Sequence, residues 1–317
     1  MGGNAFSNPK LRRIRREEIE PTLKNFVQQL NYSNFNWTYV NQNIVGSAGK
    51  QADSGDLDIA IDEREFDLDD LRSIANKWSN IQGQNAVASK HLKTGQLNLL
   101  VPIVNSNEFV QVDLILGPQD WLKFAHHSPG KDTSPYKGVF ISTLMGVMAK
   151  LKKDYELKVP ESSPWAKGDD TRIAEVIWAY NLEKGIHRKW RLKLKPDENL
   201  SEVDPDFWES NLQRIAQKAG VDVNGIPRFT RTGYVTDPMD VVRILIDDTV
   251  TPADIDTFEK LVSVVKSKVT PEQWQTIKNR TVEALWRSSA KKEFNSLDNV
   301  KNLSIFKEYD RSLFRAS

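Results

Sequence analysis

The sequence contains no cysteine among its 317 residues. This absence excludes disulfide bonds, zinc sites with thiolate ligands and catalysis by a cysteine nucleophile. An excess of charge of one sign is also missing, because 44 Lys and Arg face 43 Asp and Glu and the net charge is +1. A strongly basic protein that coats nucleic acid is therefore not expected, although local basic patches are compatible with this balance.

Long apolar runs are absent as well. No segment approaches the roughly 18 consecutive apolar residues that a membrane-spanning helix needs. The beginning of the sequence, MGGNAFSNPK, lacks the apolar core of a signal peptide. Phe6 stands where an N-myristoylation motif requires Ser or Thr. We therefore expect a cytoplasmic protein with no membrane partner.

Three common catalytic motifs are missing. The stretch GSAGK is too short for a phosphate-binding P-loop, and Lys50 is not followed by Ser or Thr. The sequence has neither the GxSxG motif of a nucleophile elbow nor the HExxH motif of a zinc protease. These absences leave a kinase, a hydrolase and a protease without support. The composition, 39% apolar and 27% charged, is typical of a globular protein.

The first half of the chain alternates between helical and strand-like patterns. Apolar spacing predicts helices over residues 16–30 and 68–79. The second half of the stretch NYSNFNWTYVNQ, together with the following NIVG, predicts a strand that ends in a turn, and DLDIAID has the strict alternation of a half-buried strand. QLNLLVPIV and FVQVDLIL flank the turn-like NSNE and predict a hairpin. This order predicts an α+β fold with a mixed β-sheet and helices.

The second half has mostly helical spacing. We expect a domain of residues 1–150 followed by a mostly helical domain of residues 151–317. The boundary is expected at about residues 150–165, because KVPESSPWAKGDD is rich in Pro, Ser and Gly. The segments with helical spacing are residues 140–151, 170–185, 205–220, 237–248, 254–269 and 271–294.

Two acidic residues on the predicted strand DLDIAID carry the most specific chemistry. Asp56 and Asp58 are two residues apart, so both carboxylates project from one face of the strand. Neighbouring carboxylates repel, and a divalent cation compensates their charge. Mg²⁺ favours carboxylate oxygens and accepts substrate phosphates as further ligands. If FVQVDLIL lies beside this strand, Asp113 completes a triad able to hold two ions about 4 Å apart.

The turn before this strand favours binding of phosphate. Gly46 lets the backbone approach a ligand closely. The hydroxyl of Ser47 and exposed N–H groups are suited to phosphate oxygens. Lys50, in the loop GKQADSG, offers a positive charge to a triphosphate. These residues are the candidate nucleotide contacts next to the acidic strand.

The stretch GSAGKQADSGDLDIAI resembles the signature of the DNA polymerase β-like nucleotidyltransferase superfamily. That signature is a Gly-Ser or Gly-Gly turn, a short loop, and two acids that alternate with hydrophobic residues on a strand. A third acid lies on a later strand. Gly46 and Ser47 match the turn, and the three acids are Asp56, Asp58 and Asp113. The resemblance covers roughly residues 35–145.

The resemblance implies a nucleotidyltransferase that transfers a nucleoside monophosphate from an NTP to a hydroxyl acceptor and releases pyrophosphate. It implies two Mg²⁺ ions, with Mn²⁺ as a substitute, bound by the three acids. Asp56 and Asp58 would bridge both ions, and Asp113 would bind the second ion and help to deprotonate the acceptor hydroxyl. Gly46 and Ser47 would hold the β- and γ-phosphates of the NTP.

A looser resemblance concerns the stretch DWLKFAHHSPGKDTSPYKGVFISTLM, which runs from a predicted helix through a polar turn into another helix. Polymerases of this superfamily often carry a turn near the triphosphate at this position. His126, His127, Ser128 and Lys137 are therefore candidate nucleotide contacts. A zinc site at the His pair is not favoured, because the other two histidines are far away in the sequence.

The acceptor is predicted from two basic stretches. KLRRIRR at residues 10–16 and HRKWRLKLK at residues 187–195 offer cations for a phosphate backbone, and Trp190 offers a stacking surface. A charged entry to a helix and an exposed alternating strand explain the same stretches. We expect a nucleic-acid 3′ end, and thus RNA binding. The alternatives are an oligonucleotide or cyclic-nucleotide synthase and a non-catalytic interaction module that keeps the fold.

Overall fold

A computed structural model describes residues 5–130, 132–134, 136, 138–159, 161–162, 171–192, 201–202, 233–287, 300, 303 and 305–306. The chain forms two compact units. The first comprises Met1–Leu144, Leu182–Lys184 and Thr236–Ser317. The second comprises Met145–Asn181 and Gly185–Val235. This division differs from the expected boundary at residues 150–165, because the second unit is inserted into the first.

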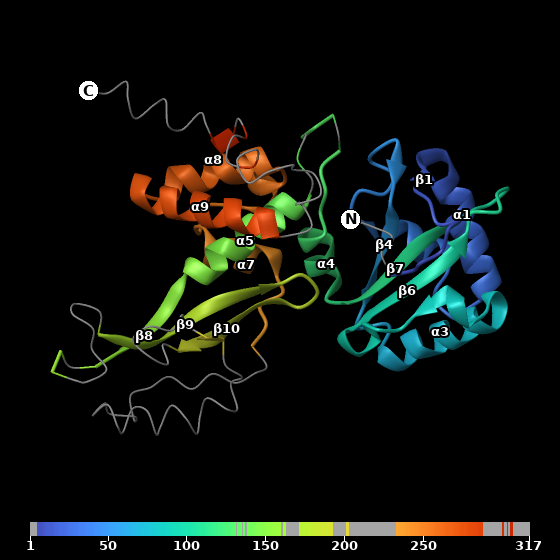
Figure 1. Ribbon diagram of the computed structural model, residues 1–317, viewed down its shortest axis with the longest axis horizontal. Coiled ribbons are helices and arrows are strands. Elements are labelled where there is room, and N and C mark those ends of the chain that lie inside the picture. The colour runs from blue at the N-terminus through green and yellow to red at the C-terminus, as the bar shows by residue number, and fades with distance from the viewer. Residues whose placement is uncertain are drawn as a thin grey trace. The chain divides into compact units, whose positions relative to one another are not determined.

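The first unit contains a mixed five-stranded sheet, in which β4 and β7 run parallel and the other neighbours run antiparallel (Figure 1). The predicted acidic strand and the predicted hairpin of β6 and β7 are confirmed, and the mixed α/β architecture is consistent with the expected α+β class. The strands, in their order across the sheet, are β2 (Ile44–Val45), β4 (Asp56–Asp62), β7 (Phe109–Gly117), β6 (Gln96–Pro102) and β5 (Val87–Ala88).

Helices α1 (Arg16–Leu30) and α3 (Leu68–Gln82) contact each other and β6. Each buries an apolar stripe, and Asp67 caps α3 by accepting hydrogen bonds from the N–H groups of Asp69 and Asp70. Both predicted helices are confirmed, and α3 extends three residues beyond its predicted end. The main core of this unit includes Phe26, Trp78, Leu57, Ile59, Ile61, Val112, Leu114, Leu97 and Leu99.

The acids alternate with these core residues along β4 and β7, so they lie on the opposite face of the sheet. Further along the same face, Ala60 and Ile115 form a small apolar cluster with Leu122 of α4 (Gln119–Ala125) and Val45 of β2. The sheet therefore has one face committed to the core. The other face carries Asp56 and Asp58 at the start of β4, Ala60 next to the apolar cluster, and Asp62 at the end of the strand.

The strand predicted just before the acidic strand is absent over most of its predicted length. Trp37–Gln42 forms helix α2, and only Ile44–Val45 pairs with β4. Asn36 explains the helix, because its side chain accepts a hydrogen bond from the N–H of Tyr39 at 3.0 Å and caps the first turn. The local cap outweighs the preference of the aromatic and β-branched residues for a strand.

Among the residues that the structure describes, α5 (Gly138–Leu151) begins in the first unit, and α7 (Pro238–Leu245), α8 (Phe258–Lys268) and α9 (Pro271–Arg287) follow residue 236. These four helices confirm predictions, although the end of the predicted segment 271–294 lies outside the described residues. A short 3-10 turn, η4 (Pro252–Ile255), precedes α8. In the described part of the chain, no helix combines the length and apolar character needed to cross a lipid bilayer.

The second unit is built around an antiparallel sheet with the order β11-β10-β9-β8. The expectation that residues 151–317 are mostly helical is therefore wrong for the beginning of this range. Residues 170–185, predicted as a helix, form strand β9, because their run of Ala, Val, Ile and Trp is buried on both faces and masks the period of a strand. The predicted helix at residues 205–220 lies outside the described residues. The strands are β8 (Lys153–Lys158), β9 (Arg172–Asn181), β10 (Gly185–Leu192) and β11 (Ser201–Glu202).

Candidate metal and phosphate site

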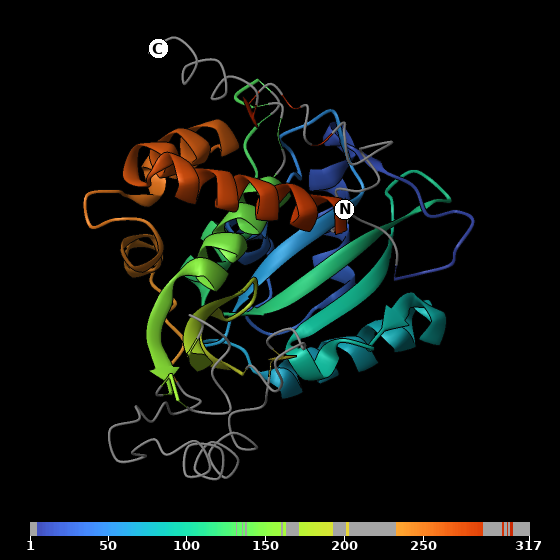
Figure 2. The ribbon, with the colours of Figure 1, turned by 60° about the vertical axis from the view of Figure 1, so that its left-hand side comes forward.

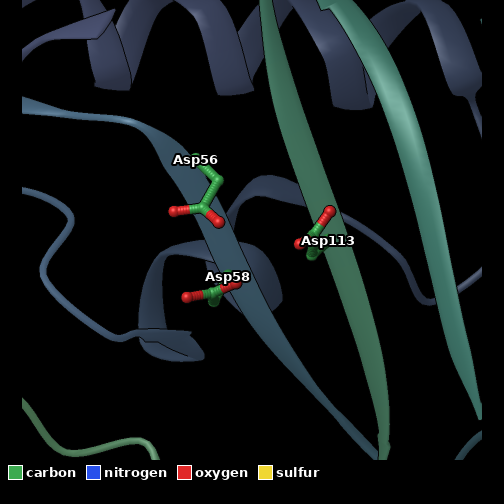
Figure 3. A group of neighbouring side chains, drawn as sticks. All are labelled: Asp56, Asp58 and Asp113. Atoms are coloured by element: carbon green, nitrogen blue, oxygen red, sulfur yellow. The ribbon is translucent and has the colours of Figure 1, made fainter. Parts of the chain in front are cut away.

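The parallel pairing of β4 and β7 brings three carboxylates together. Asp58 and Asp113 lie directly opposite each other in the two strands, and Asp56 lies one pleat earlier on β4. Each of the three offers a carboxylate oxygen, and these oxygens all lie within 4.8 Å of one another. Figure 3 shows the three side chains on the same side of the two strands, and Figure 2 shows β4 and β7 side by side. The sheet itself therefore fixes the triad.

Two amide side chains hold the carboxylate of Asp113. Asn98 lies opposite Asp113 on β6, and its Nδ2 donates to Asp113 Oδ1 at 2.7 Å. Gln111 donates through Nε2 to Oδ1 at 2.8 Å and to Oδ2 at 3.0 Å. Both amides are buried, so these hydrogen bonds fix the orientation of the carboxylate. Oδ2 receives fewer hydrogen bonds and is the freer oxygen.

The sequence did not lead us to predict that Asn98 and Gln111 belong to the site. Their positions contain a usable signal, because Gln111 precedes Asp113 by one strand period and Asn98 interrupts the apolar strand QLNLLVPIV. A polar side chain in an otherwise buried strand usually has a polar partner. The partner of both amides is Asp113, and only the register of the β6–β7 hairpin shows that Asn98 lies opposite it.

The environment of the triad disfavours three negative charges. Burial raises the pKa of Asp113 to about 6, with a smaller contribution from the charge of Asp56, although the amide hydrogen bonds oppose the shift. Burial and then the charges of Asp56 and Asp113 raise the pKa of Asp58 well above its usual value. Burial also raises the pKa of Asp56. Repulsion is therefore stored in the site when all three carboxylates are ionised.

The donor set fits a hard divalent cation. Among the described residues, no Lys, Arg or His forms an ion pair with any of the three carboxylates. Three clustered carboxylates without a cationic partner are costly to bury, and a bound divalent ion offsets that cost. Because all the ligands are oxygens, Mg²⁺ or Mn²⁺ fits this site better than Zn²⁺.

Gly46 lies directly against the triad. Its φ is +71°, in the left-handed region, and a Cβ atom added there would lie 2.7 Å from Asp58 Oδ2. Its N–H donates to the carbonyl of His126 at 3.0 Å. This N–H is therefore already used, which corrects the expectation that the Gly46 backbone holds phosphate. Gly46 instead gives the carboxylate of Asp58 the room it needs.

Ser47 and Lys50 close a four-residue turn, in which the N–H of Lys50 donates to the carbonyl of Ser47 at 3.1 Å. Gly49 has a φ of +74°, which suits the third position of such a turn. The hydroxyl of Ser47 lies 3.4 Å from that of Ser54, and Ser54 Oγ donates to the carbonyl of Asp56 at 2.8 Å. The turn is thereby connected to the first residue of the acidic strand.

The segment after α4 lies along this turn. Lys50 Nζ donates to the carbonyl of Ser128 at 2.9 Å, and Gly46 forms a parallel bridge with His127. Ser128 itself is buried, and its hydroxyl accepts from the N–H of Gly138 at 3.4 Å. Its side chain is therefore used inside the protein. Lys137, the other candidate contact from this segment, lies outside the described residues.

The two adjacent histidines have different surroundings. Burial lowers the pKa of His126 to about 4, and its Nε2 is buried without a hydrogen-bond partner among the described residues. His126 is therefore neutral at pH 7. Burial and then the nearby charge of Lys50 lower the pKa of His127. The ring of His127 therefore lies near the ammonium of Lys50, one of the candidate phosphate contacts.

The arginines of the first basic stretch are engaged in local ion pairs. Arg12 Nη2 lies 2.8 Å from Glu18 Oε1, and Arg12 Nε lies 2.5 Å from Glu108 Oε2. Arg13 pairs with Asp53 at 2.7 Å, next to the two-residue pairing of β1 (Ile14–Arg15) with β3 (Asp53–Ser54). These contacts fasten the loop that leads into the acidic strand. They favour the explanation of a charged helix entry for this stretch.

The described part of the second basic stretch is also packed within its sheet. Trp190 is buried, and its ring meets that of Tyr155 edge to face at 5.8 Å. Arg191 Nε donates to the buried Glu175 at 2.8 Å. Trp190 is therefore a packing residue and does not offer a free surface for a base.

Searches against protein-family models and against curated proteins found no match for this chain.

The metal-free protein is expected to lose about 1 kcal/mol of stability between pH 5 and pH 7.5 through Asp113 alone. The pKa of this carboxyl is about 6 in the folded protein and about 3.9 in an unfolded chain. The folded state therefore binds more protons between these values, and its stability falls as the pH rises through 6. Urea unfolding in EDTA should show this loss in the wild type and a smaller one in Asp113→Asn. Equal slopes in both proteins would contradict the prediction.

Proposed function

We propose that this protein is a metal-dependent nucleotidyltransferase with a nucleotidyltransferase-type sheet, which transfers a nucleoside monophosphate from an NTP to a hydroxyl acceptor. The convergence of Asp56, Asp58 and Asp113 on one face of two parallel strands carries this proposal. The close approach of Gly46 to Asp58 supports it, because it places the turn of residues 46–50 beside the carboxylates. The sequence resemblance predicted this combination of turn and acids.

The three carboxylates would hold Mg²⁺ or Mn²⁺, which would neutralise charge on the phosphate oxygens and lower the pKa of the acceptor hydroxyl. The N–H and hydroxyl of Ser47 and the ammonium of Lys50 would bind the outer phosphates. The acceptor oxygen bonds to the α-phosphorus, the bond to the β-phosphate oxygen breaks, and pyrophosphate leaves. Asp113 Oδ2 would take the acceptor proton, since Oδ1 accepts two amide hydrogen bonds and Oδ2 accepts only one.

The acceptor that we propose to test first is a nucleic-acid 3′ end. Lys10, Arg15 and Arg16 of the first basic stretch remain exposed, whereas Arg12 and Arg13 are paired with acids. The carbonyl of Lys10 accepts from the N–H of Phe109 on β7 at 3.0 Å, and exposed cations of this kind suit a phosphate backbone. A nucleotide acceptor, which would give an oligonucleotide or cyclic product, and a protein hydroxyl complete the panel.

The test is transfer of label from each α-³²P-labelled NTP to RNA, DNA, nucleotide and protein acceptors with Mg²⁺ or Mn²⁺. We expect transfer by the wild type, and a fall of about 10²-fold or more in Asp56→Asn and in Asp113→Asn. Asp69→Asn is the matched control, because Asp69 is an exposed acid that pairs with Arg72 on α3. A wild-type protein that binds no NTP and transfers no label would favour the interaction module.

A further inference from the structure

The segment that connects α4 to α5, residues 126–137, joins the candidate phosphate turn to the helices after residue 236; the structure describes it except for Lys131, Pro135 and Lys137. At its beginning, this connecting segment contacts the turn twice. The carbonyl of His126 accepts from the N–H of Gly46 at 3.0 Å. The carbonyl of Ser128 accepts from Lys50 Nζ at 2.9 Å. Both contacts are made by backbone carbonyls, so the path of the segment determines where the turn lies.

Further along, the connecting segment is fastened to the beginning of α8. Ser134 Oγ lies 2.8 Å from Glu259 Oε2 and 3.1 Å from Oε1. The same hydroxyl accepts from the N–H of Tyr136 at 3.0 Å. The ring of Tyr136 meets that of Phe258 at 5.2 Å, and His127 is hydrogen-bonded to the backbone of Asp256. The attachment therefore has a polar and an apolar part.

The Ser134–Glu259 pair is more than a surface contact. Ser134 is 5% exposed, and both oxygens of Glu259 are directed to its hydroxyl. Among the described residues, no Lys or Arg forms an ion pair with Glu259. A hydrogen bond from a buried hydroxyl to a carboxylate is charge-assisted and directional. This pair is therefore suited to fixing one path of the connecting segment.

The connecting segment is also closed on itself. The N–H groups of Thr133 and Ser134 donate to the carbonyl of Gly130 at 2.9 and 3.1 Å. At its end, a Cβ atom on Gly138 would lie 2.1 Å from the carbonyl oxygen of His127. The two ends of the segment therefore touch.

We propose that Ser134 and Glu259 are positioning residues for the nucleotide-binding turn of residues 46–50 and act through the connecting segment. This inference rests on the nucleotidyltransferase function proposed above. Neither residue contacts the triad, and neither is assigned a role in the chemistry. Their loss should let the carbonyls of His126 and Ser128 shift, and with them the N–H of Gly46 and the ammonium of Lys50.

The first measurement is hydrogen–deuterium exchange of the full, metal-free and nucleotide-free chain. In Ser134→Ala and Glu259→Gln, the hydrogen-bonded amides of the turn, those of Gly46 and Lys50, should exchange about 3- to 30-fold faster than in the wild type. Ser134→Thr, which keeps the hydroxyl, should remain close to the wild type. The matched control is Glu283→Gln, which removes an exposed acid that lies 3.9 Å from Arg287 on α9.

The second measurement is steady-state kinetics with the NTP that the wild type binds best. Both variants should raise the KM for that NTP by about 3- to 30-fold and change kcat by less than about twofold. The double variant should be no worse than either single variant, because the two residues act as one pair. Mn²⁺ affinity at the triad should not change.

The outcomes separate this inference from the proposed function. Unchanged exchange at residues 46–50, or an unchanged KM in variants that are merely less stable, would overturn the positioning role alone. A wild-type protein that binds none of the four NTPs would overturn the nucleotidyltransferase function and the positioning role with it. Additive effects in the double variant would show that the two residues do not act through each other.

Discussion

Replacing Asp58 with asparagine is expected to abolish label transfer and to make the metal-free protein more stable. Asp58 is the central acid of the triad, and burial, Asp56 and Asp113 all raise its pKa. Asparagine keeps the shape but removes one of three repelling charges. We expect a fall in transfer of about 10³-fold or more and a gain in unfolding free energy of about 1–3 kcal/mol at pH 7.5 in EDTA.

The opposite signs of these two effects distinguish a metal site from a structural acid. An acid that stabilised the fold through a hydrogen bond or ion pair would lower the stability when replaced, as expected for Asp62, which pairs with Arg64 at 2.7 Å. Adding Mg²⁺ should stabilise the wild type against urea and leave Asp58→Asn unchanged. If Asp58→Asn is less stable than the wild type in EDTA, the proposed repulsion in the triad is absent.

The alternation of DLDIAID allowed the acidic strand to be predicted, because one face of the strand is entirely apolar and the other carries the acids. The prediction that Asp113 joins Asp56 and Asp58 depended on the assumption that their two strands are neighbours. A sequence reveals the period of a strand but not its partner, and β4 and β7 are separated by α3 and the hairpin strand β6. The roles assigned to the three acids remain predictions.

The predicted fold was wrong where a strand is buried on both faces and where the structure depends on contacts between residues far apart in the sequence. Strand β9 is buried on both faces, so its sequence lacks the alternation that marks a half-buried strand. The insertion of the second unit was not visible, because the return of the chain at residue 236 to the first unit depends on packing between distant segments. The hydrogen bond of Ser134 to Glu259 joins residues 125 positions apart, which no local pattern reveals.

Gly46→Ala should separate the geometry of the metal site from the strain of the turn. Alanine at a φ of +71° costs about 1–2 kcal/mol. In addition, its Cβ would lie 2.7 Å from Asp58 Oδ2, so the carboxylate or the turn must move. We expect Mn²⁺ affinity and label transfer to fall by about 10- to 100-fold, because a displacement of about 1 Å at a reacting group has effects of this size.

Gly49→Ala is the matched comparison for this prediction. Gly49 has a similar φ of +74°, but a Cβ atom added there would have no neighbour within 4 Å. Both variants should therefore lose unfolding free energy in urea through the left-handed strain, and Gly46→Ala should lose more, because its Cβ also meets Asp58 Oδ2. Only Gly46→Ala should lose Mn²⁺ affinity, measured by titration calorimetry of the metal-free protein. Equal Mn²⁺ affinities in the two variants would mean that the carboxylate of Asp58 does not need the space beside Gly46 to bind metal.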